Sequence, residues 1–408
     1  MSETKQVVGK QLLFRALRHE PVDVVPWLPF AGVHAGKLVG YSAREVLTDA
    51  DKLFEALLAV NRTYGPDGQP VVFDLQIEAE ILGCDLLWAD KAPPTVASHP
   101  LADNLVVPTD LPSPSDGRLP MVLDVMRRMK AEVGDRTALY GLVTGVFTLA
   151  SHLRGTEIFM DMFDQPDFLR DLLAYARDVV QRMAELYVNA GMDVIAVVDP
   201  LVSQISPRHF KELLSEPYSA VFDVIRQQGA YSSFFVCGDA TKNIEVMCQT
   251  GPDSISIDEN INLAEAKAVT DRYDITMGGN IPLTTHMLLG TQLDNMKFVV
   301  DLLDRIAPEG APRDASQGPV HRNAVPRNFI LAPGCDMPYD VPAENVVGVL
   351  QAVRDPEGTA AMVANYQAAS VDLDAVVLPD YAILEKPLVE VFTLDSDTCA
   401  ACSYMRDA

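Results

Sequence analysis

The chain has few basic residues and no long apolar run. Each of these shortages excludes a class of function. Lys and Arg total 32 against 57 Asp and Glu, which gives a formal net charge of −25. This balance disfavours binding to nucleic acids or to anionic membranes, because both partners attract a basic surface. No stretch approaches the roughly 18 uninterrupted apolar residues expected of a membrane-spanning helix.

Cysteine is also scarce, with six in 408 residues. Residues 1–20 carry scattered charges and no continuous apolar core, so they do not resemble a secretory signal peptide. A disulfide-rich secreted scaffold is therefore not expected, and reduced thiols could serve in metal binding or catalysis. We expect a soluble, cytoplasmic protein.

Several common motifs are missing. The sequence contains no G-x-x-x-x-G-K-[ST], no G-x-G-x-x-G after an apolar run, no H-E-x-x-H and no G-x-S-x-G. These motifs mark phosphate-binding loops, dinucleotide sites, zinc peptidases and serine hydrolases respectively. The sequence therefore gives no support to those four functions.

Short apolar runs alternate with longer segments of helical periodicity. Eight such runs span residues 24–30, 70–74, 138–143, 193–199, 231–236, 253–257, 274–278 and 328–332. Near-continuous apolar strands that alternate with helices indicate a parallel sheet covered on both faces. The predicted fold is α/β, a (β/α)8 TIM barrel over residues 1–355, followed by a C-terminal extension over 356–408.

The clearest helix runs from about Pro166 to just before Gly191. Its apolar residues recur at helical spacing, Asp164 lies where an N-cap belongs, and Gly191 lies where helices commonly end. Similar patterns predict helices over residues 43–63, 207–228, 239–250, 262–271, 295–306 and 342–353. Residues 307–327 are rich in Pro, Gly and Ala and predict a long loop.

Polar residues follow the predicted strands, where the active site of a (β/α)8 barrel lies. Asp74, Asp199 and Asp239 are the candidate catalytic acids or bases. Asp74 and Asp199 are equally well explained as helix caps, and His34 as a structural histidine. Substrate contacts are expected from His34, Glu78, Thr144, Ser203, Glu259 and Asn280, with Asp258 and Asp336 nearby.

Two distant apolar runs, "YSSFFVC" and "NFILAPGC", each end in a cysteine. Cys237 and Cys335 should therefore meet at the barrel mouth, where zinc would accept them as thiolates and require three or four protein ligands. The alternative is that both are small buried apolar residues, as we expect for Cys84 and Cys248. Cys399 and Cys402, in C-x-x-C spacing, could complete a zinc site by folding over the mouth, or form a separate reactive or inert pair.

Five segments together resemble a known superfamily. They are "EPVDVVPWLPF", "FDLQIEAEILG", "VCGDATKNIEVMCQTGPDSISIDENINLAEAK", "MGGNIPLTTHMLLGT" and "LAPGCDMPYDVPAENV". Over about residues 15–355 the chain resembles the uroporphyrinogen decarboxylase superfamily, and looks most similar to its cobalamin-dependent methyltransferases. The resemblance implies a (β/α)8 barrel that moves a methyl group between a small substrate (methyl ether, methylamine or thiol) and a corrinoid cobalt.

The resemblance also implies a zinc site. In the coenzyme M branch, zinc is held by a His-x-Cys pair and by the cysteine of a later Gly-Cys motif. Cys237 and Cys335 match the two cysteines, but Phe235 stands at the histidine position and cannot bind a metal. The implied ligand set is therefore incomplete unless Cys399 or Cys402 contributes.

The resemblance leaves two further functions open. Decarboxylases of the superfamily carry an arginine-rich R-Q-A-G-R-type segment that holds substrate carboxylates, whereas the matching stretch here, "PWLPFAGVHAG", has no arginine. A decarboxylase of a porphyrinogen-like substrate is therefore the alternative, and a non-catalytic corrinoid-binding scaffold is a third. The sequence has no corrinoid-binding D-x-H-x-x-G segment, so a separate corrinoid protein is the expected partner. A homodimer is compatible with the sequence.

Overall fold

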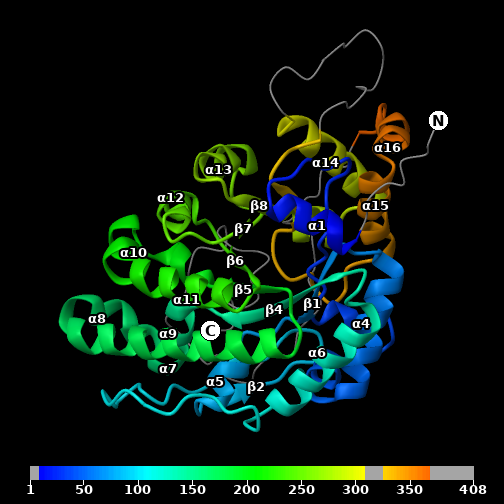
Figure 1. Ribbon diagram of the computed structural model, residues 1–408. Helices are drawn as coiled ribbons and strands as arrows, with labels where there is room; N and C mark the ends of the chain where they lie inside the picture. The colour runs from blue at the N-terminus through cyan, green and yellow to red at the C-terminus, as the bar shows by residue number, and fades with distance from the viewer. Residues whose placement is uncertain (1–8, 308–324, 368–408) are drawn as a thin grey trace.

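The computed structural model describes residues 9–307 and 325–367 (Figure 1). Within these ranges the core is a parallel sheet of seven strands in the order β1-β4-β5-β6-β7-β8-β9. These strands coincide with seven of the eight predicted apolar runs. They are β1 (Gly68–Val72), β4 (Ala138–Thr144), β5 (Val194–Val198), β6 (Tyr231–Val236), β7 (Ser254–Ile257), β8 (Thr276–Ile281) and β9 (Phe329–Pro333).

The remaining predicted run, residues 24–30, closes the sheet into a barrel. Trp27 forms a parallel bridge with Leu331 of β9, where the Leu28 N–H donates to the Leu331 carbonyl at 2.9 Å. On the other side, the N–H of Asp67 donates to the Trp27 carbonyl at 2.9 Å, just before β1. The segment thus takes the place of the eighth strand, and the predicted TIM-barrel architecture is confirmed.

Helices cover the outside of the barrel (Figure 1), and a short antiparallel pair, β2 (Leu86–Leu87) and β3 (Thr95–Val96), lies beside it. The helices that precede β5 are α1 (Lys10–Leu17), α2 (His34–Lys37), α3 (Ala43–Thr48), α4 (Ala50–Tyr64), α5 (Ile77–Ile81), α6 (Leu119–Val133), α7 (Val146–Arg154), α8 (Ile158–Asp164) and α9 (Pro166–Asn189). Those that follow are α10 (Pro207–Leu213), α11 (Ser215–Gln227), α12 (Ile244–Cys248), α13 (Leu263–Thr270), α14 (Gln292–Arg305), α15 (Ala343–Arg354) and α16 (Pro356–Val363).

The long helix α9 begins at Pro166, as predicted, but Asp164 is not its N-cap. Asp164 is the last residue of α8, and the cap position is taken by Gln165, whose side chain makes no capping hydrogen bond. Only Gln165 separates the two helices. Asp164 is part of α8 and so cannot be the N-cap of α9. Gly191 has φ +102°, a left-handed conformation that suits glycine where the chain leaves the helix.

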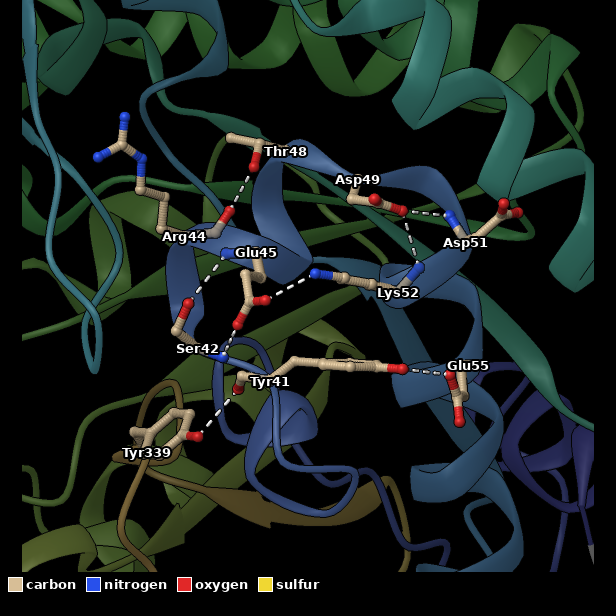
Figure 2. Close-up of polar contacts among 10 residues, drawn as sticks. All are labelled: Tyr41, Ser42, Arg44, Glu45, Thr48, Asp49, Asp51, Lys52, Glu55 and Tyr339. Carbon is tan, nitrogen blue, oxygen red and sulfur yellow. Dashed lines mark hydrogen bonds and ion pairs between the residues drawn. The ribbon is translucent and has the colours of Figure 1, made fainter.

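The loop that leaves β9 is fastened to Tyr41, which lies just before α3 (Figure 2). Ser42 and Glu45 form a capping box at the start of α3, and Asp49 caps α4. The hydroxyl of Tyr339, from the loop after β9, donates to the Tyr41 carbonyl at 2.9 Å. The loop that also carries Cys335 is therefore held at the residue before the N-cap of α3.

The predicted boundary at residue 355 is followed directly by α16. Ala360 and Val363 of this helix pack with Met296 and Val300 of α14 in a small apolar cluster. Most of the predicted loop over 307–327, and most of the predicted extension, lie outside the described residues. In the part of the chain that is described, no helix is both long and apolar enough to cross a bilayer.

Candidate functional site

The two strand-end cysteines meet at the barrel mouth. Cys237 follows β6 and Cys335 follows β9, and their Sγ atoms lie 2.7 Å apart. Both side chains are buried. Two thiolates on a tetrahedral zinc, with Zn–S bonds of about 2.3 Å, would lie about 3.8 Å apart. The sulfurs would therefore have to separate by about 1 Å to share one metal ion.

The described residues do not complete a zinc site. Among them, no group of three or more His, Cys, Asp or Glu side chains is arranged to hold a metal ion. The position of the expected histidine is filled by Phe235, whose ring stacks on Phe30 with centroids 4.7 Å apart. Zinc needs at least three protein ligands, and Cys237 and Cys335 supply two. The tail cysteines Cys399 and Cys402 lie outside the described residues.

Strand alternation explains why Phe235 and Cys237 lie on the same side of β6. Successive side chains of a strand point to opposite faces. Phe234 packs outward on Tyr218 of α11, with ring centroids 4.4 Å apart, whereas Phe235 meets Phe30 and Phe73. Cys237 therefore follows Phe235 on the inner face, next to an apolar layer.

The loop after β9 holds Cys335 and Asp336 in place. The Asp336 carboxylate accepts from the Gly32 N–H at 2.7 Å, and the Met337 N–H donates to the Phe30 carbonyl at 2.8 Å. A Cβ at Gly32 would lie only 2.6 Å from the carboxylate oxygens, so this close approach requires glycine. Burial raises the pKa of Asp336 to about 8, which lets it hold a proton at neutral pH.

His34 lies in α2 and is fully buried. One ring nitrogen lies 3.0 Å from the Tyr339 carbonyl oxygen and the other lies 2.7 Å from the Tyr64 hydroxyl. Burial lowers the pKa of His34 to about 4, so the ring is neutral at pH 7. Both ring nitrogens contact other residues of the protein. In this arrangement His34 therefore has no ring nitrogen available for the predicted contact with substrate.

Asp199, after β5, holds the turn between β4 and α7. Its carboxylate accepts from the Phe147 N–H at 2.8 Å, from the Thr148 hydroxyl at 2.6 Å, and from the Tyr218 hydroxyl. A Cβ at Gly145 would lie 2.4 Å from a carboxylate oxygen. These contacts cap the start of α7 from a neighbouring strand, so the geometry favours the capping alternative over a catalytic role.

Asp74, directly after β1, is buried beside a cation that the sequence reasoning missed. The Arg118 guanidinium donates to the Asp74 carboxylate at 2.6 Å. Close by, Glu78 accepts from the Thr144 N–H at 3.0 Å, and its second oxygen lies 2.8 Å from the Thr144 hydroxyl. Burial raises the pKa of Glu78 to about 7. Arg118 precedes α6 and belongs to no motif, so no sequence signal pointed to it.

Asp239 and Ser203 lie in the loops above the strand ends. Asp239 is exposed and accepts from the N–H and hydroxyl of Thr241 at 3.0 and 2.6 Å. The Ser203 hydroxyl donates to the Pro200 carbonyl at 2.7 Å. Both contacts are local to a turn, and the catalytic and substrate-binding roles of these residues stay predictions.

Asn280 and Glu259 join neighbouring strand ends. The Asn280 amide donates to the carbonyls of Asp258 and Ile261, both at 2.8 Å. The Glu259 carboxylate accepts from the Leu283 N–H, and burial raises the pKa of Glu259 to about 7. Asn280 therefore orders the loop after β7, while Glu259 is a carboxyl group that can exchange a proton near neutral pH.

The mouth therefore combines a thiol pair with carboxyl groups whose pKa values lie near or above neutrality. Burial is the main cause of the raised pKa of Asp336, and the charge of Asp74 adds to it. Such a set can bind a metal ion with help from further ligands, or can move a proton to or from a substrate heteroatom.

Comparisons with known proteins show which family the chain belongs to. The family model for uroporphyrinogen decarboxylase (URO-D) matches residues 9–356. The methylcobamide:CoM methyltransferase MtbA of Methanosarcina acetivorans is 28% identical over 304 residues, covering 72% of this chain and 88% of that protein. A uroporphyrinogen decarboxylase of Nostoc punctiforme is 23% identical over 269 residues, covering 64% of this chain and 74% of that protein.

A solved structure described as a methyltransferase from Methanosarcina mazei superimposes with a TM-score of 0.74. It is 25% identical and covers 85% of this chain and 98% of its own. The family match spans most of the chain, and the similarity to the methyltransferases exceeds the similarity to the decarboxylase. The chain therefore belongs to the uroporphyrinogen decarboxylase family and is an enzyme of its methyltransferase kind.

Proposed function

We propose that the protein is a corrinoid-dependent methyltransferase that moves a methyl group between a small substrate and the cobalt of a corrinoid carried by a partner protein. The substrate would be a methyl ether, a methylamine or a thiol. The observation that carries the proposal is the Cys237–Cys335 pair at the barrel mouth, in a chain similar to methylcobamide:CoM methyltransferases. A cytoplasmic location and a homodimer remain further proposals from the sequence.

The chain's own residues would position the reactants and handle protons. When bound, the corrinoid supplies the cobalt that exchanges the methyl group. The heteroatom of the substrate must lose or gain a proton as its methyl group is exchanged. Glu259 and Asp336 are candidates for that exchange, because burial raises their pKa values to about 7 and about 8. Holding the substrate in line with the incoming group would supply the remaining rate enhancement.

Zinc is the proposed metal, held by Cys237, Cys335 and one or both of Cys399 and Cys402. Three protein ligands leave an open position that suits catalysis, whereas four thiolates close the site and make it structural. The proposal rests on the nearness of the first two sulfurs and on the C-x-x-C spacing of the others.

The methyl-transfer proposal is tested with the purified full chain and free cobalamin. Methylcobalamin is incubated with coenzyme M and other thiols, and cob(I)alamin is incubated with methyl ethers and methylamines. The cobalt oxidation state is followed by its visible absorption spectrum. Enzyme-dependent conversion with one substrate class supports the proposal, and inactivity across all three classes contradicts it.

The zinc proposal predicts a specific loss of metal. The double variant Cys399→Ser/Cys402→Ser should lose zinc, because Cys237 and Cys335 alone leave the metal under-coordinated. Zinc per chain is measured by elemental analysis after gel filtration. Cys248→Ser is the matched control, since this buried cysteine lies in α12 and should not affect zinc content. Stoichiometric zinc in the double variant would contradict the proposal.

The second candidate is decarboxylation of a polycarboxylate such as a porphyrinogen, favoured by the family match and the similarity to the Nostoc enzyme. Residues 26–36 contain no arginine to hold substrate carboxylates. Incubation with uroporphyrinogen separates the candidates, because release of carbon dioxide would reverse their order.

A further inference from the structure

The two cysteines at the barrel mouth lie closer together than a shared metal ion allows. The Sγ atoms of Cys237 and Cys335 are 2.7 Å apart. Sulfurs joined in a disulfide lie about 2.05 Å apart, whereas two thiolates on one zinc ion lie about 3.8 Å apart. The pair would have to close by about 0.65 Å to form the bond, and to open by about 1.1 Å to admit zinc. The arrangement is therefore nearer to a disulfide than to a metal site.

Hydrogen bonds of the adjacent residues fix the backbone on which each cysteine lies. Gly238, directly after the first cysteine, donates its N–H to the Asp258 carboxylate at 2.9 Å. Gly334, directly before the second, donates its N–H to the Ile281 carbonyl at 3.0 Å. A Cβ at Gly334 would lie only 2.6 Å from the backbone nitrogen of Glu259, so this close approach requires glycine. The approach of the two sulfurs is therefore set by the anchored ends of β6 and β9.

The pair lies next to an apolar layer. Phe235, two positions before Cys237 on the same face of β6, stacks on Phe30 with ring centroids 4.7 Å apart. Cys237 and Cys335 are only 4% and 7% exposed. A disulfide carries no charge and so suits such surroundings, whereas two buried thiolates require a cation. Phenylalanine at the position of the expected histidine therefore leaves a setting that favours the disulfide.

We propose that Cys237 and Cys335 form a reversible disulfide when the protein meets a hydroperoxide such as hydrogen peroxide. In the reduced protein the pair supplies two ligands to the proposed zinc ion. In the oxidised protein the same sulfurs are bonded to each other and cannot hold the metal, so the pair switches the site off. The inference rests on the proposed function only in this consequence, because the disulfide itself requires neither zinc nor methyl transfer.

The reaction balances with one molecule of hydrogen peroxide as the oxidant. One cysteine, as its thiolate, attacks a peroxide oxygen, so that the O–O bond breaks and an S–O bond forms to give a sulfenic acid. The released hydroxide takes up the proton that this thiol has lost and leaves as water. The second thiolate then attacks the sulfenic sulfur, the S–O bond breaks and the S–S bond forms. The second hydroxide leaves as water with the proton of the second thiol, so two thiols are oxidised and one peroxide is reduced.

The disulfide is tested by counting thiols in the Cys399→Ser/Cys402→Ser variant, which keeps four of the six cysteines. Metal is removed with EDTA under dithiothreitol, the reductant is removed, and hydrogen peroxide is added. The remaining thiols are alkylated with N-ethylmaleimide in urea and located by mass spectrometry of a tryptic digest without reduction. The count should fall from four to two, with one cross-linked pair of peptides that carries Cys237 and Cys335. Dithiothreitol should restore all four thiols.

Cys84 and Cys248 are controls within the same chain. They are as buried as the pair, at 5% and 3% exposed, but Cys84 donates to the His152 carbonyl at 3.3 Å and Cys248 lies in α12. Burial alone predicts the same behaviour for all four thiols, whereas proximity predicts that only the pair is oxidised. Both controls should remain open to alkylation. Equal oxidation of all four thiols, or oxidation of the pair to sulfinic acid without a cross-link, would overturn the proposal.

Single variants in the same background show whether proximity selects the pair. In Cys237→Ala and in Cys335→Ala, the remaining thiol of the pair should stop at the sulfenic acid, which dimedone traps, and no cross-link should form. A cross-link to Cys84 or Cys248 in either variant would contradict the selection. If neither variant folds, the peptide map of the protein with four cysteines decides the question without them.

Bound zinc separates failure of this inference from failure of the proposed function. In the full chain loaded with zinc, the Cys237–Cys335 cross-link should form roughly tenfold more slowly than in the metal-free full chain, because the metal occupies the thiolates. Elemental analysis of the same samples gives the zinc content before and after oxidation. A cross-link in a chain that holds no zinc in either state supports the disulfide and contradicts the zinc proposal. Zinc that stays bound after the cross-link has formed would overturn the switch.

Discussion

At the scale of single residues, Phe235 decides whether the barrel alone can hold zinc. Its ring is fully buried and lies between Phe30 and Phe73, on the inner face that Cys237 shares. We predict that Phe235→His restores stoichiometric zinc in the Cys399→Ser/Cys402→Ser background. The apo protein should lose about 1–3 kcal/mol of unfolding free energy, because a polar ring enters an apolar layer.

Phe234→His is the matched control for this prediction. Phe234 occupies the next position on β6 but packs on Tyr218 of α11. The control should be destabilised to a similar extent without gaining zinc. If both variants bind zinc equally, or neither does, then the position of Phe235 is not what limits the metal site.

Because of His34, the free energy of unfolding of the protein should depend on pH. Burial lowers the pKa of His34 to about 4, below its ordinary value of 6.5, so the unfolded chain binds the proton more readily. The stabilising contribution is complete above pH 6.5 and is lost as pH falls towards 4. The maximum effect is about 3 kcal/mol. Urea unfolding at pH 7.5 and 5 should show a smaller loss of stability on acidification for His34→Gln than for the wild type, and equal losses would contradict the assignment.

At the scale of elements, the strands were predictable and the contacts of the site residues were not. Barrel strands such as β5 and β6 are buried on both faces, so they appear in the sequence as continuous apolar runs. Because parallel strand ends meet at one mouth, the approach of Cys237 and Cys335 followed from strand order. By contrast, the partners of His34 include a backbone carbonyl about 300 residues away, at Tyr339. Nothing in the local sequence specifies such a contact.

Arg118 illustrates the same limit. Its charge pairs with Asp74, 44 residues earlier, and the two meet only because the segment before α6 returns to the end of β1. The sequence reasoning considered residues that directly follow strands, and Arg118 does not. Residues contributed by connecting segments are therefore found only once the chain path is known.

The hydrogen bonds that Asp199, after β5, makes to the start of α7 provide a test of its capping role. Asp199→Asn loses acceptor capacity for Phe147, Thr148 and Tyr218, and leaves a buried donor in its place. We expect a loss of about 2–4 kcal/mol in the free energy of unfolding. Asp239→Asn, at an exposed turn, should change it by less than about 0.5 kcal/mol. If urea unfolding gives similar losses of unfolding free energy for the two variants, the capping role of Asp199 is contradicted.

At the scale of the whole molecule, the barrel is closed by contacts between early and late segments. Asp67, before β1, is buried and accepts from the Trp27 N–H at 2.7 Å in the segment that replaces the eighth strand. The same carboxylate accepts from Arg354, at the end of α15, with both oxygens 2.8 Å from one nitrogen. One side chain therefore joins the segment before β1, the segment that replaces the eighth strand and the end of α15.

Breaking this closure should weaken the whole fold. Arg354→Met leaves the buried Asp67 carboxylate without its cation, and we expect a loss of about 3 kcal/mol in unfolding free energy. Combining it with Asp67→Asn should cost less than the sum of the two single variants, because the carboxylate that needs the cation is then gone. Arg136→Met, which removes an exposed pair with Asp135, is the control and should have little effect. Urea unfolding measured by fluorescence and circular dichroism should give one coincident transition that shifts for Arg354→Met. An unshifted midpoint would show that the barrel closes without this ion pair.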